Sequence, residues 1–269
     1  MSPWQDKWAL VTGASAGIGW HLAQQLAAAR ANLVLVARRV DRLEELAAKL
    51  RQDHGVQVEI CPADLVDPRA PEQVFAFTQQ KGLPIEILIN NAGFGVYDEF
   101  YKNDLRRVLD MVQVNVTAVV HLTHLFLPAM IERRSGYIMI VSSTAAFQAV
   151  PYLGAYSATK GFELLFGEAV AEELRHSGVR LSVLCPGPTE TEFNQVAGQT
   201  ARTKHRETAE KVARVGLQAL AAGKPSVISG KLNWFNMEMQ RVIPRRLVTR
   251  VTARMFAPHA EEQPSPKQP

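Results

Sequence analysis

A tyrosine and a lysine lie four residues apart in the segment Tyr156-Ser157-Ala158-Thr159-Lys160. In a helix this spacing puts Tyr156 and Lys160 on one face, one turn apart. A free tyrosine has a pKa near ~10 and is a poor base around neutrality. Lowering that pKa to ~7 takes about 4 kcal/mol, roughly the Coulomb energy of one cation at ~4 Å in an effective dielectric of ~20. The pair indicates an activated, proton-transferring tyrosine, although taken alone it is more typical of a packed or solvated helix face.

A glycine-rich segment near the N-terminus could bind phosphates. It runs Thr12-Gly13-Ala14-Ser15-Ala16-Gly17-Ile18-Gly19, directly after an apolar run and before a helical pattern. Gly13 permits a tight turn, Gly17 lets the backbone approach a pyrophosphate, and Gly19 lets helix and strand pack closely. The phosphates would meet free N–H groups at the positive end of the helix dipole. A flexible turn is the alternative, but the flanking strand and helix favour dinucleotide binding.

The end of the second apolar run indicates which dinucleotide is bound. Enzymes that prefer NAD carry an acidic residue there, which holds the ribose 2′-hydroxyl. This chain has Ala37 followed by Arg38 and Arg39, whose guanidinium groups can pair with a 2′-phosphate and stack on adenine. NADP(H) is therefore predicted in preference to NAD(H). Two solvated arginines in a loop are the alternative interpretation, and it is less favoured at this position.

These features occur together with several others, and the whole set resembles the short-chain dehydrogenase/reductase superfamily in order and spacing. The resemblance covers about residues 5–195. The residues and motifs that carry it are Gly13–Gly19, Asn90-Asn91-Ala92-Gly93, Asn115, Ser143, Tyr156, Lys160 and Pro186-Gly187-Pro188-Thr189-Glu190-Thr191. The resemblance implies an oxidoreductase that transfers hydride between NADP(H) and a small-molecule carbonyl or alcohol.

The resemblance also implies roles for four catalytic residues. Tyr156 would give a proton to a carbonyl or take one from an alcohol, while Lys160 lowers its pKa and holds the nicotinamide ribose. Ser143 would hydrogen-bond the substrate oxygen. Asn115 would hold a water that links Lys160 to solvent. Taken singly, Ser143 is better explained as an ordinary strand-end hydroxyl, Asn115 as a polar residue that kinks a helix and Asp64 as a helix cap. Their joint spacing favours the functional roles instead.

The remaining implied roles concern the cofactor. Asn91, Ala92 and Gly93 would line the adenosine ribose, Asp64 would reach the adenine, and Thr191 would fix the carboxamide. Ala16 departs from the pattern, because some NADP-dependent relatives carry a basic residue there; Arg38 and Ser15 would then hold the 2′-phosphate. The full set expected at the cofactor is Gly13, Ser15, Gly17, Ile18, Gly19, Arg38, Arg39, Asp64, Leu65, Asn91, Ala92, Gly93, Tyr156, Lys160, Pro186, Gly187, Thr189 and Thr191.

The elements that position these residues alternate along the chain. Helical patterns that begin near Ile18, Arg42, Pro71, Leu105, Tyr156 and Thr208 separate apolar, β-rich runs. Such alternation predicts an α/β fold with a doubly wound parallel sheet, a Rossmann fold, in a single domain over residues 1–257. The predicted strands are Trp8–Thr12, Asn32–Ala37, Val56–Pro62, Ile85–Asn90, Tyr137–Ser142, Val179–Cys185 and a short seventh strand at Ser226–Ile228.

Composition excludes several other classes of protein. With 269 residues, 47% of them hydrophobic, the chain fits one large soluble α/β domain, and no window approaches the ~18 uninterrupted apolar residues of a membrane span. Met1–Lys7 lacks the apolar region of a secretory signal. Cys61 and Cys185 are expected to be reduced core thiols. We therefore expect a cytoplasmic protein.

Other catalytic chemistries have little support. His121 and His124 lie three residues apart but lack a third ligand nearby, so no metal site is expected. No Gly-x-Ser-x-Gly segment occurs, which removes the main hydrolase signature. Outside residues 231–256 the charges sum to about −1, so no nucleic-acid partner is expected.

The region after the sixth strand is expected to choose the substrate. We predict a substrate loop over about 189–240, and an apolar pocket formed by Phe94, Val96, Tyr97, residues 145–152 and Phe193. A moderately hydrophobic carbonyl or secondary alcohol would fit it. The alternative is that several of these residues only pack loops together.

The C-terminal segment could serve a second purpose. A basic amphipathic helix is expected over about 244–257, followed by a disordered tail over 258–269. Packing of this helix on the body is favoured over contact with a membrane surface or a partner. The resemblance further implies a homodimer or homotetramer. A non-catalytic NADPH-sensing or scaffold protein, possibly bound to a membrane through this helix, is the alternative function.

Overall fold

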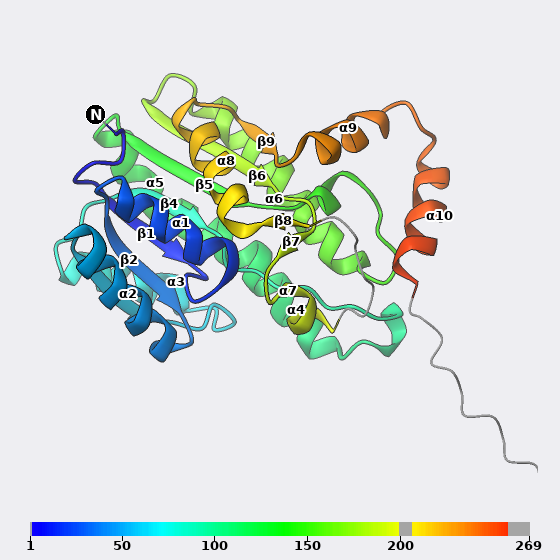
Figure 1. Ribbon diagram of the computed structural model, residues 1–269, viewed down its shortest axis with the longest axis horizontal. Coiled ribbons are helices and arrows are strands. Elements are labelled where there is room, and N and C mark those ends of the chain that lie inside the picture. Colours follow the sequence, from blue (N-terminus) through cyan, green and yellow to red (C-terminus); the bar gives the residue numbers. More distant parts are fainter. Residues whose placement is uncertain (1, 199–205, 258–269) are drawn as a thin grey trace, which may run out of the picture.

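A seven-stranded parallel sheet, with helices on both faces, forms the centre of the molecule (Figure 1). The computed structural model describes residues 2–198 and 206–257, so the predicted tail over 258–269 lies outside the described residues. The strand order is β3-β2-β1-β4-β5-β6-β9. The strands are β1 Trp8–Thr12, β2 Asn32–Ala37, β3 Val58–Pro62, β4 Ile85–Asn90, β5 Gly136–Val141, β6 Val179–Cys185 and β9 Ser226–Ile228, and a separate pair is formed by β7 Thr189–Glu190 and β8 Glu207–Thr208.

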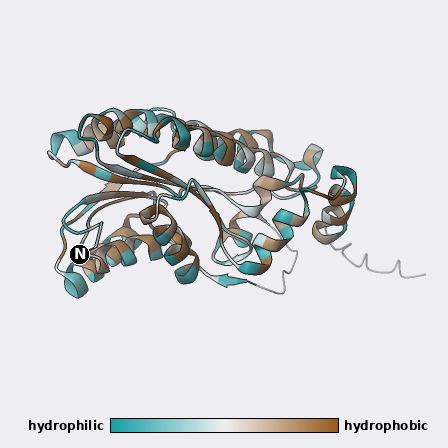
Figure 2. Cartoon of the chain, turned by 90° about the horizontal axis from the view of Figure 1, so that it is seen from above, coloured by the Kyte–Doolittle hydropathy of each residue, from teal (hydrophilic) through white to brown (hydrophobic). Residues whose placement is uncertain are grey.

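Helices connect successive strands, because parallel neighbours need a crossover. Seen from above, the apolar strands lie between two layers of helices (Figure 2). The helices are α1 Gly17–Ala28, α2 Val40–His54, α3 Ala70–Gln80, α4 Leu105–Val112, α5 Ala118–Glu132, α6 Gly154–Glu173, α7 Phe193–Ala197, α8 Ala209–Ala221, α9 Lys231–Met239 and α10 Arg245–Phe256; short helical turns are η1 Phe100–Lys102, η2 Gln113–Thr117 and η3 Thr144–Phe147.

Burial of both sheet faces explains the apolar runs in the sequence. Every residue of β1 is buried, and β2, β4, β5 and β6 are buried along most of their length. Helix α1 covers one face with Leu22 and Leu26, which are completely buried. Helix α5 covers the other with Leu122, Phe126 and Met130. Because the strands are parallel and packed on both faces, their carboxyl ends meet along one side of a well-packed sheet.

The predicted strands agree with the structure within two residues at each end. Strand β3 begins at Val58 and β5 ends at Val141, so Ser142 lies just beyond the sheet. Within the substrate region predicted over about 189–240, the helix expected near Thr208 and the short strand expected at Ser226–Ile228 are present as α8 and β9. Helix α8 packs on α1 and β9 pairs with β6, so both belong to the core. Strand β9 pairs with the edge that β6 would otherwise expose, and α8 covers one face of the sheet with Val212, Leu217 and Leu220.

One helical stretch has the length and hydropathy of a membrane span. It runs over Leu105–Glu132 as α4, η2 and α5. Val119, Leu122 and Phe126 from this stretch are buried in the core against the sheet. Its apolar composition is thus explained by packing within the fold.

The last two helices lie at one end of the molecule, beyond the sheet (Figure 1). Helix α10 corresponds to the helix expected over 244–257, and it packs on the body through Thr252, whose hydroxyl donates to the carbonyl of Ala149 at 3.0 Å. The Tyr97 hydroxyl donates to the carbonyl of Phe256 at 2.6 Å. Helix α10 is therefore held against the loops at the carboxyl ends of the strands.

Candidate active site

A pocket of about 480 Å³ opens at the carboxyl ends of the strands and extends from the glycine turn to the end of α10. Parallel sheets bind ligands at this edge. All but two of the residues expected at the catalytic and cofactor sites line the pocket. The exceptions are Gly19 and Asn115, which lie behind its wall.

The glycine turn is held by polar contacts to β4. The Thr12 hydroxyl donates to the carbonyl of Ile89 and accepts from the backbone N–H groups of Asn91 and Ala92 at 2.9 and 3.0 Å. The Asn91 side chain donates to the carbonyl of Thr12 at 2.8 Å. These bonds fix the distance between the turn and the segment after β4.

The three glycines of the turn have the backbone conformations and close contacts that the sequence predicted. Gly13 and Gly17 have φ values of +65° and +55°, which side chains rarely adopt. A Cβ at Gly19 would collide with the carbonyl of Gly13 and the Asn91 amide. Gly19 therefore serves close packing of α1 and does not line the pocket.

The end of the pocket near β2 carries exposed ion pairs. Arg38 lies 3.8 Å from the Asp64 carboxylate, and Arg39 lies 3.0 Å from that of Glu192. Arg39 also donates to the Ser15 hydroxyl at 3.2 Å. Glu192 was not predicted from the sequence, since only the packing of the segment after β7 brings it to Arg39.

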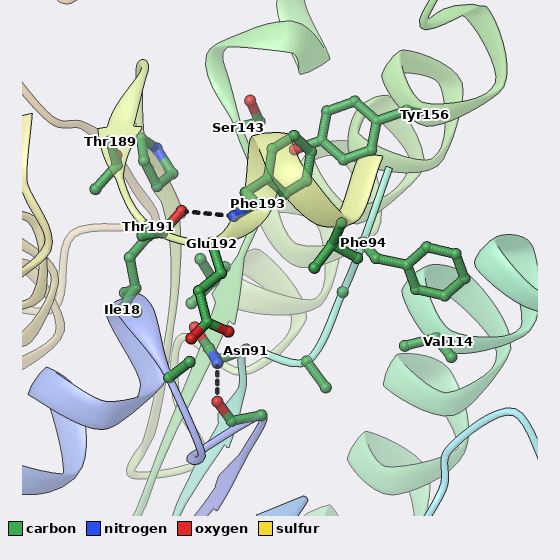
Figure 3. A pocket seen from close by; sticks show the side chains of 18 of the residues that line it. Ile18, Asn91, Phe94, Val114, Ser143, Tyr156, Thr189, Thr191, Glu192 and Phe193 are labelled. Carbon is green, nitrogen blue, oxygen red and sulfur yellow. Dashed lines mark hydrogen bonds between the residues drawn. The ribbon is translucent and has the colours of Figure 1, made fainter. Parts of the chain in front are cut away.

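At the opposite end, Tyr156 lies in the first turn of α6 and is buried. Ser143 lies two residues after the end of β5 and faces Tyr156, and the Phe193 ring lies 5.1 Å from the tyrosine ring (Figure 3). Burial raises the pKa of Tyr156 above its ordinary value. Lys160 and the Ser143 hydroxyl act to lower it, and Glu163 acts to raise it. The expected lowering of this pKa is thus not reached in the protein alone, because burial and Glu163 outweigh Lys160.

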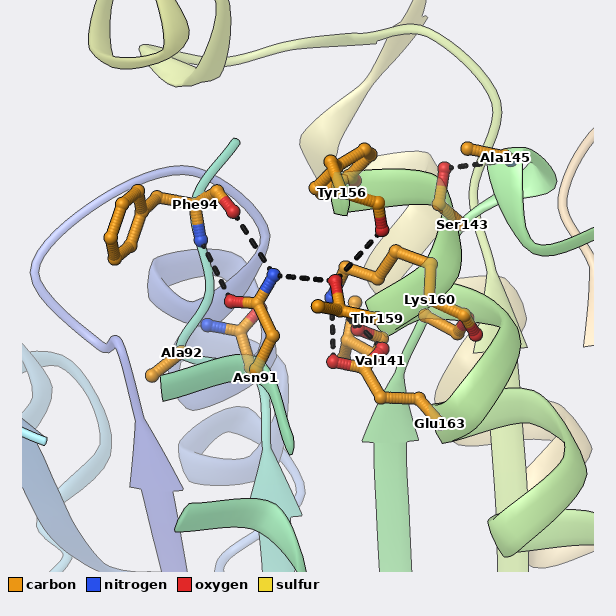
Figure 4. A network of polar contacts seen from close by, with 12 residues as sticks. Asn91, Ala92, Phe94, Val141, Ser143, Ala145, Tyr156, Thr159, Lys160 and Glu163 are labelled. Atoms are coloured by element: carbon orange, nitrogen blue, oxygen red, sulfur yellow. Dashed lines mark hydrogen bonds and ion pairs between the residues drawn. The ribbon is translucent and has the colours of Figure 1, made fainter. Parts of the chain in front are cut away.

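Lys160 has a buried carboxylate partner that the sequence analysis missed. Its ammonium lies 2.9 Å from both carboxylate oxygens of Glu163 and donates to the carbonyl of Val141 at 2.9 Å (Figure 4). Burial raises the pKa of Glu163 to about 7, although Lys160 opposes this shift. The acid at the third residue after Lys160 was the available signal, since this spacing puts both on one helix face.

Asn115 joins the pocket wall to α6. It lies in the π-helical turn η2, its amide donates to the carbonyl of Phe94 and to the Thr159 hydroxyl at 3.0 Å each, and its side-chain oxygen accepts from the Phe94 N–H. A Cβ at Gly93 would lie 3.0 Å from that oxygen and 3.3 Å from the Lys160 ammonium. Asn115 thus lies beside Lys160, while its side chain is bonded elsewhere. Its role toward a water stays a prediction.

The substrate side of the pocket is apolar, with one correction to its predicted lining. Phe94, Phe193 and several residues of the 145–152 segment line it, as expected. Val96 and Tyr97 do not; Val96 is buried in the apolar cluster that also contains Val150, Leu153 and Tyr156, and Tyr97 packs beside Tyr152. Phe256 lines the pocket instead, because α10 folds back over it.

The groups considered for other chemistries lie apart from the pocket. Within residues 2–198 and 206–257, no group of three or more His, Cys, Asp or Glu side chains could hold a metal ion. His121 lies 3.7 Å from Glu72. Cys61 and Cys185 are buried free thiols, and burial raises their pKa values to about 11 and about 12.

Comparisons with known proteins agree with this geometry. The short chain dehydrogenase family profile matches residues 7–202. A very-long-chain 3-oxoacyl-CoA reductase from Homo sapiens is 31% identical over 251 residues, which cover 89% of this chain and 80% of the reductase.

Solved structures are similar along nearly the whole chain. A 7β-hydroxysteroid dehydrogenase has a TM-score of 0.84 and 27% identity, with 92% of this chain and 96% of that chain covered. A short-chain dehydrogenase from Sphingobium yanoikuyae in complex with NADPH has a TM-score of 0.80 and 27% identity, with 95% and 99% covered. The glycine turn, the Ser143–Tyr156–Lys160 cluster and these similarities lead to one conclusion: the chain belongs to the short-chain dehydrogenase/reductase family of oxidoreductases.

Proposed function

We propose that this protein is an NADP(H)-dependent reductase or dehydrogenase that interconverts a carbonyl and an alcohol, with Tyr156 as the general acid and base. One observation carries the proposal: Tyr156 lies at the inner end of a pocket that begins at the glycine turn, with Ser143 and Lys160 as its polar neighbours. A non-catalytic NADPH-binding protein would not need this cluster.

The pocket fits a dinucleotide along its length. The backbone at Gly17 faces the pocket with a positive φ and no side chain, next to the N-terminus of α1. Unpaired N–H groups of a helix N-terminus favour a pyrophosphate. Thr189 and Thr191 line the same pocket on the way to Tyr156. When bound, the nicotinamide would supply or accept hydride.

The chain's own residues would handle the proton and the developing charge. Tyr156 would donate its phenolic proton to the carbonyl oxygen during reduction and take a proton from the alcohol during oxidation. The Ser143 hydroxyl would hydrogen-bond the same substrate oxygen and stabilise negative charge on it. Lys160 would stabilise the phenolate and bind the ribose hydroxyls. Because Tyr156 and Lys160 are buried, the electrostatic interaction between them is weakly screened.

The preference for NADP(H) is supported by the cations at the outer end of the pocket. Arg38, Arg39 and Ser15 line it, and no acidic residue ends β2. Similar solved structures include complexes with NADPH and with NAD, so the arginines alone carry this part of the proposal. A 2′-phosphate would compete with the carboxylates of Asp64 and Glu192 for these two arginines.

The substrate is proposed to be a ketone or secondary alcohol on a large apolar skeleton. The phenyl rings of Phe94, Phe193 and Phe256 and the side chains of Val150 and Leu153 line the pocket around Tyr156. Apolar walls with few polar groups favour such ligands. The names of the 3-oxoacyl-CoA and hydroxysteroid relatives describe compounds of this kind.

We further propose that the chain forms a homodimer or homotetramer. Helices α4 and α6 leave Leu105, Leu109, Phe162 and Leu165 exposed, and the two helices contact each other. Neighbouring exposed apolar side chains mark interaction surfaces. Sedimentation velocity would show the oligomer, and Leu165→Asp would be expected to weaken it.

The function is tested by NADPH consumption with aldehydes, ketones, quinones, steroids and 3-oxoacyl thioesters. Tyr156→Phe should lower turnover of the accepted substrate by ~10²- to 10⁴-fold, because the general acid is lost. Tyr101→Phe, on the exposed turn η1, is the control and should retain the wild-type rate. Full activity of Tyr156→Phe would refute the mechanism. Tight NADPH binding without turnover of any compound would favour the sensing or scaffold alternative.

A further inference from the structure

The buried carboxylate of Glu163 lies against the lysine that the proposed mechanism needs. Glu163 and Lys160 side chains are only 1% and 5% exposed. All three N–H donors of the ammonium have acceptors in the chain: the two Glu163 oxygens and the Val141 carbonyl. Binding the ribose hydroxyls would therefore require Lys160 to release at least one of these contacts.

Glu163 also acts on Tyr156 with the opposite sign to Lys160. The ammonium lies 5.8 Å from the centre of the Tyr156 ring. Lys160 lowers the pKa of the phenol and Glu163 raises it. At this burial neither charge is screened by solvent. The Lys160 charge that Tyr156 experiences thus depends on whether Glu163 is ionised.

We propose that Glu163 is a positioning residue: its buried carboxylate holds the Lys160 ammonium and offsets the charge that Lys160 presents to Tyr156. This inference rests on the proposed function. Cofactor binding would draw Lys160 toward the ribose, and the carboxylate left behind would take up a proton. Glu163 would in this way link cofactor binding and the acidity of Tyr156 to pH.

The groups that surround Glu163 support a link to pH near neutrality. On α6 it faces Lys160 and Tyr156; at the end of β5 it faces the Ser142 hydroxyl; on β6 it faces the Cys185 thiol. Burial raises the Cys185 pKa to about 12, so this thiol stays neutral. Lys160 is the cation that acts on Glu163, and the pKa of Glu163 of about 7 lies in the working range.

The test compares the pH dependence of alcohol oxidation in the wild type, Glu163→Gln and Glu168→Gln. In the free enzyme Lys160 would act on Tyr156 unopposed once the carboxylate is removed. The rising limb of kcat/KM for the oxidised cofactor, which reports the free enzyme, should therefore move to lower pH by about one unit. Glu168 lies on the same helix and accepts a hydrogen bond from the Ser226 hydroxyl at 2.7 Å, so its variant should keep the wild-type profile. An unchanged profile in Glu163→Gln with normal turnover would overturn the inference and leave the proposed function intact.

A second measurement uses the wild-type protein, in case Glu163→Gln does not fold. NADH binding is followed by calorimetry in buffers of different ionisation enthalpy, since NADH lacks a titrating 2′-phosphate. Release of Lys160 from Glu163 should be accompanied by proton uptake at neutral pH. Binding without net proton uptake would contradict the role of Glu163, whether or not a substrate has been found.

A different observation concerns the exposed face of α9 and α10. On α10, Val248, Thr252 and Phe256 follow one another at four-residue spacing and turn toward the body, where Thr252 is buried. The outer face carries two parallel stripes at the same spacing, one apolar and one basic. The apolar stripe is Leu247, Val251 and Met255, and the basic stripe is Arg246, Arg250 and Arg254.

Helix α9 and the turn after it continue this pattern. Trp234 and Phe235 are each 54% exposed, although large aromatic side chains normally lose more surface. Residues 231–256 contain six basic residues and one acidic residue, a local charge of +5. We define the α9–α10 surface as the exposed side chains Lys231, Leu232, Trp234, Phe235, Met239, Arg241, Val242, Arg245, Arg246, Leu247, Arg250, Val251, Arg254 and Met255.

We infer that the α9–α10 surface docks on a bilayer that contains anionic lipids. Arginine heads beside exposed Trp, Phe and Leu side chains suit the boundary between headgroups and acyl chains. A second copy of this chain fits poorly, since two surfaces of charge +5 would repel. Phe256 at the end of α10 lines the substrate pocket. Docking would therefore place the apolar pocket next to the membrane.

Co-sedimentation with vesicles of phosphatidylcholine, alone or mixed with phosphatidylglycerol, tests this surface. The protein should bind the mixed vesicles at low salt and lose at least about tenfold in affinity with Arg246→Glu/Arg250→Glu, since each basic residue contributes roughly 1 kcal/mol. Trp234→Ala/Phe235→Ala should also weaken binding. Arg106→Glu, an exposed arginine on α4, is the control and should bind as the wild type.

Three outcomes would overturn the membrane inference. These are failure to bind mixed vesicles at low salt, equal binding to phosphatidylcholine alone, and self-association that the same variants abolish without any vesicle binding. The last result would identify a second copy as the occupant. None of these measurements depends on turnover, so they are independent of the proposed function.

Discussion

The two ends of the pocket both contain cation–carboxylate pairs, and the pairs differ chiefly in burial. At the inner end, Lys160 and Glu163 are almost inaccessible to solvent. At the outer end, the side chain of Arg38 is 69% exposed, and Arg39 and Glu192 are both more than two-fifths exposed. Water and salt screen the outer pairs, so a ligand phosphate can replace a carboxylate at little cost. The inner pair interacts strongly, so a change in either partner affects stability, pH dependence and Tyr156 together.

The largest expected effect breaks the buried pair. Lys160→Met would leave Glu163 as a lone buried carboxylate and should lower the free energy of unfolding by about 3–5 kcal/mol at alkaline pH. The pKa of Glu163 is raised in the folded protein, so the folded state binds the extra proton. Stability is therefore lost as pH rises from the unfolded value of Glu toward the folded value, and the defect should be smaller at acid pH.

Denaturant unfolding at two pH values measures this effect. Lys160→Met/Glu163→Leu should recover much of the lost stability, because no charge is left unpaired. Arg39→Ala, which breaks an exposed pair, should cost only about 0–1 kcal/mol. Equal losses for Lys160→Met and Arg39→Ala would show that burial does not distinguish the two ends.

An intermediate effect is expected on cofactor choice at the outer end. Arg38→Ala and Arg39→Ala should each raise the KM for NADPH by about 10- to 100-fold, because a charge-assisted hydrogen bond contributes roughly 1.5–3 kcal/mol. The KM for NADH, which has no 2′-phosphate, should change little. Steady-state kinetics with both cofactors at fixed ionic strength measures the ratio. Parallel losses for NADPH and NADH would assign the arginines to general structure.

The smallest expected effect concerns the carboxylate that faces Arg39. Glu192→Gln removes a charge that competes with the 2′-phosphate, so NADPH should bind about two- to fivefold more tightly, within the range of an exposed ion pair. Fluorescence titration of NADPH measures the Kd. Asp53→Asn breaks the exposed Lys49–Asp53 pair away from the pocket and is the control. Weaker NADPH binding in Glu192→Gln would mean that Glu192 positions Arg39 for the phosphate.

Much of the fold and of the pocket was predictable from local patterns. The order of strands and helices followed from alternation of hydrophobic period, and β1, β2, β4, β6 and β9 have the predicted bounds. The glycine turn and the Tyr156–Lys160 spacing are also local features, since their geometry depends on residues within a few positions of one another. The sequence by itself therefore determined the scaffold and the glycine turn and tyrosine–lysine pair that line the pocket.

The tertiary structure alone decided what surrounds those groups. Glu163 lies one turn from Lys160 in any helix. Only the packing of α6 on β5 and β6 buries Glu163, and this burial lets its charge raise the pKa of Tyr156. Glu192 reaches Arg39, and Phe256 replaces Val96 and Tyr97 in the pocket lining, through contacts between distant segments. Such contacts depend on how whole helices and strands pack, which no local pattern reveals. The energy of an interaction between two charges depends on how much solvent this packing excludes, so it too is decided only by the tertiary structure.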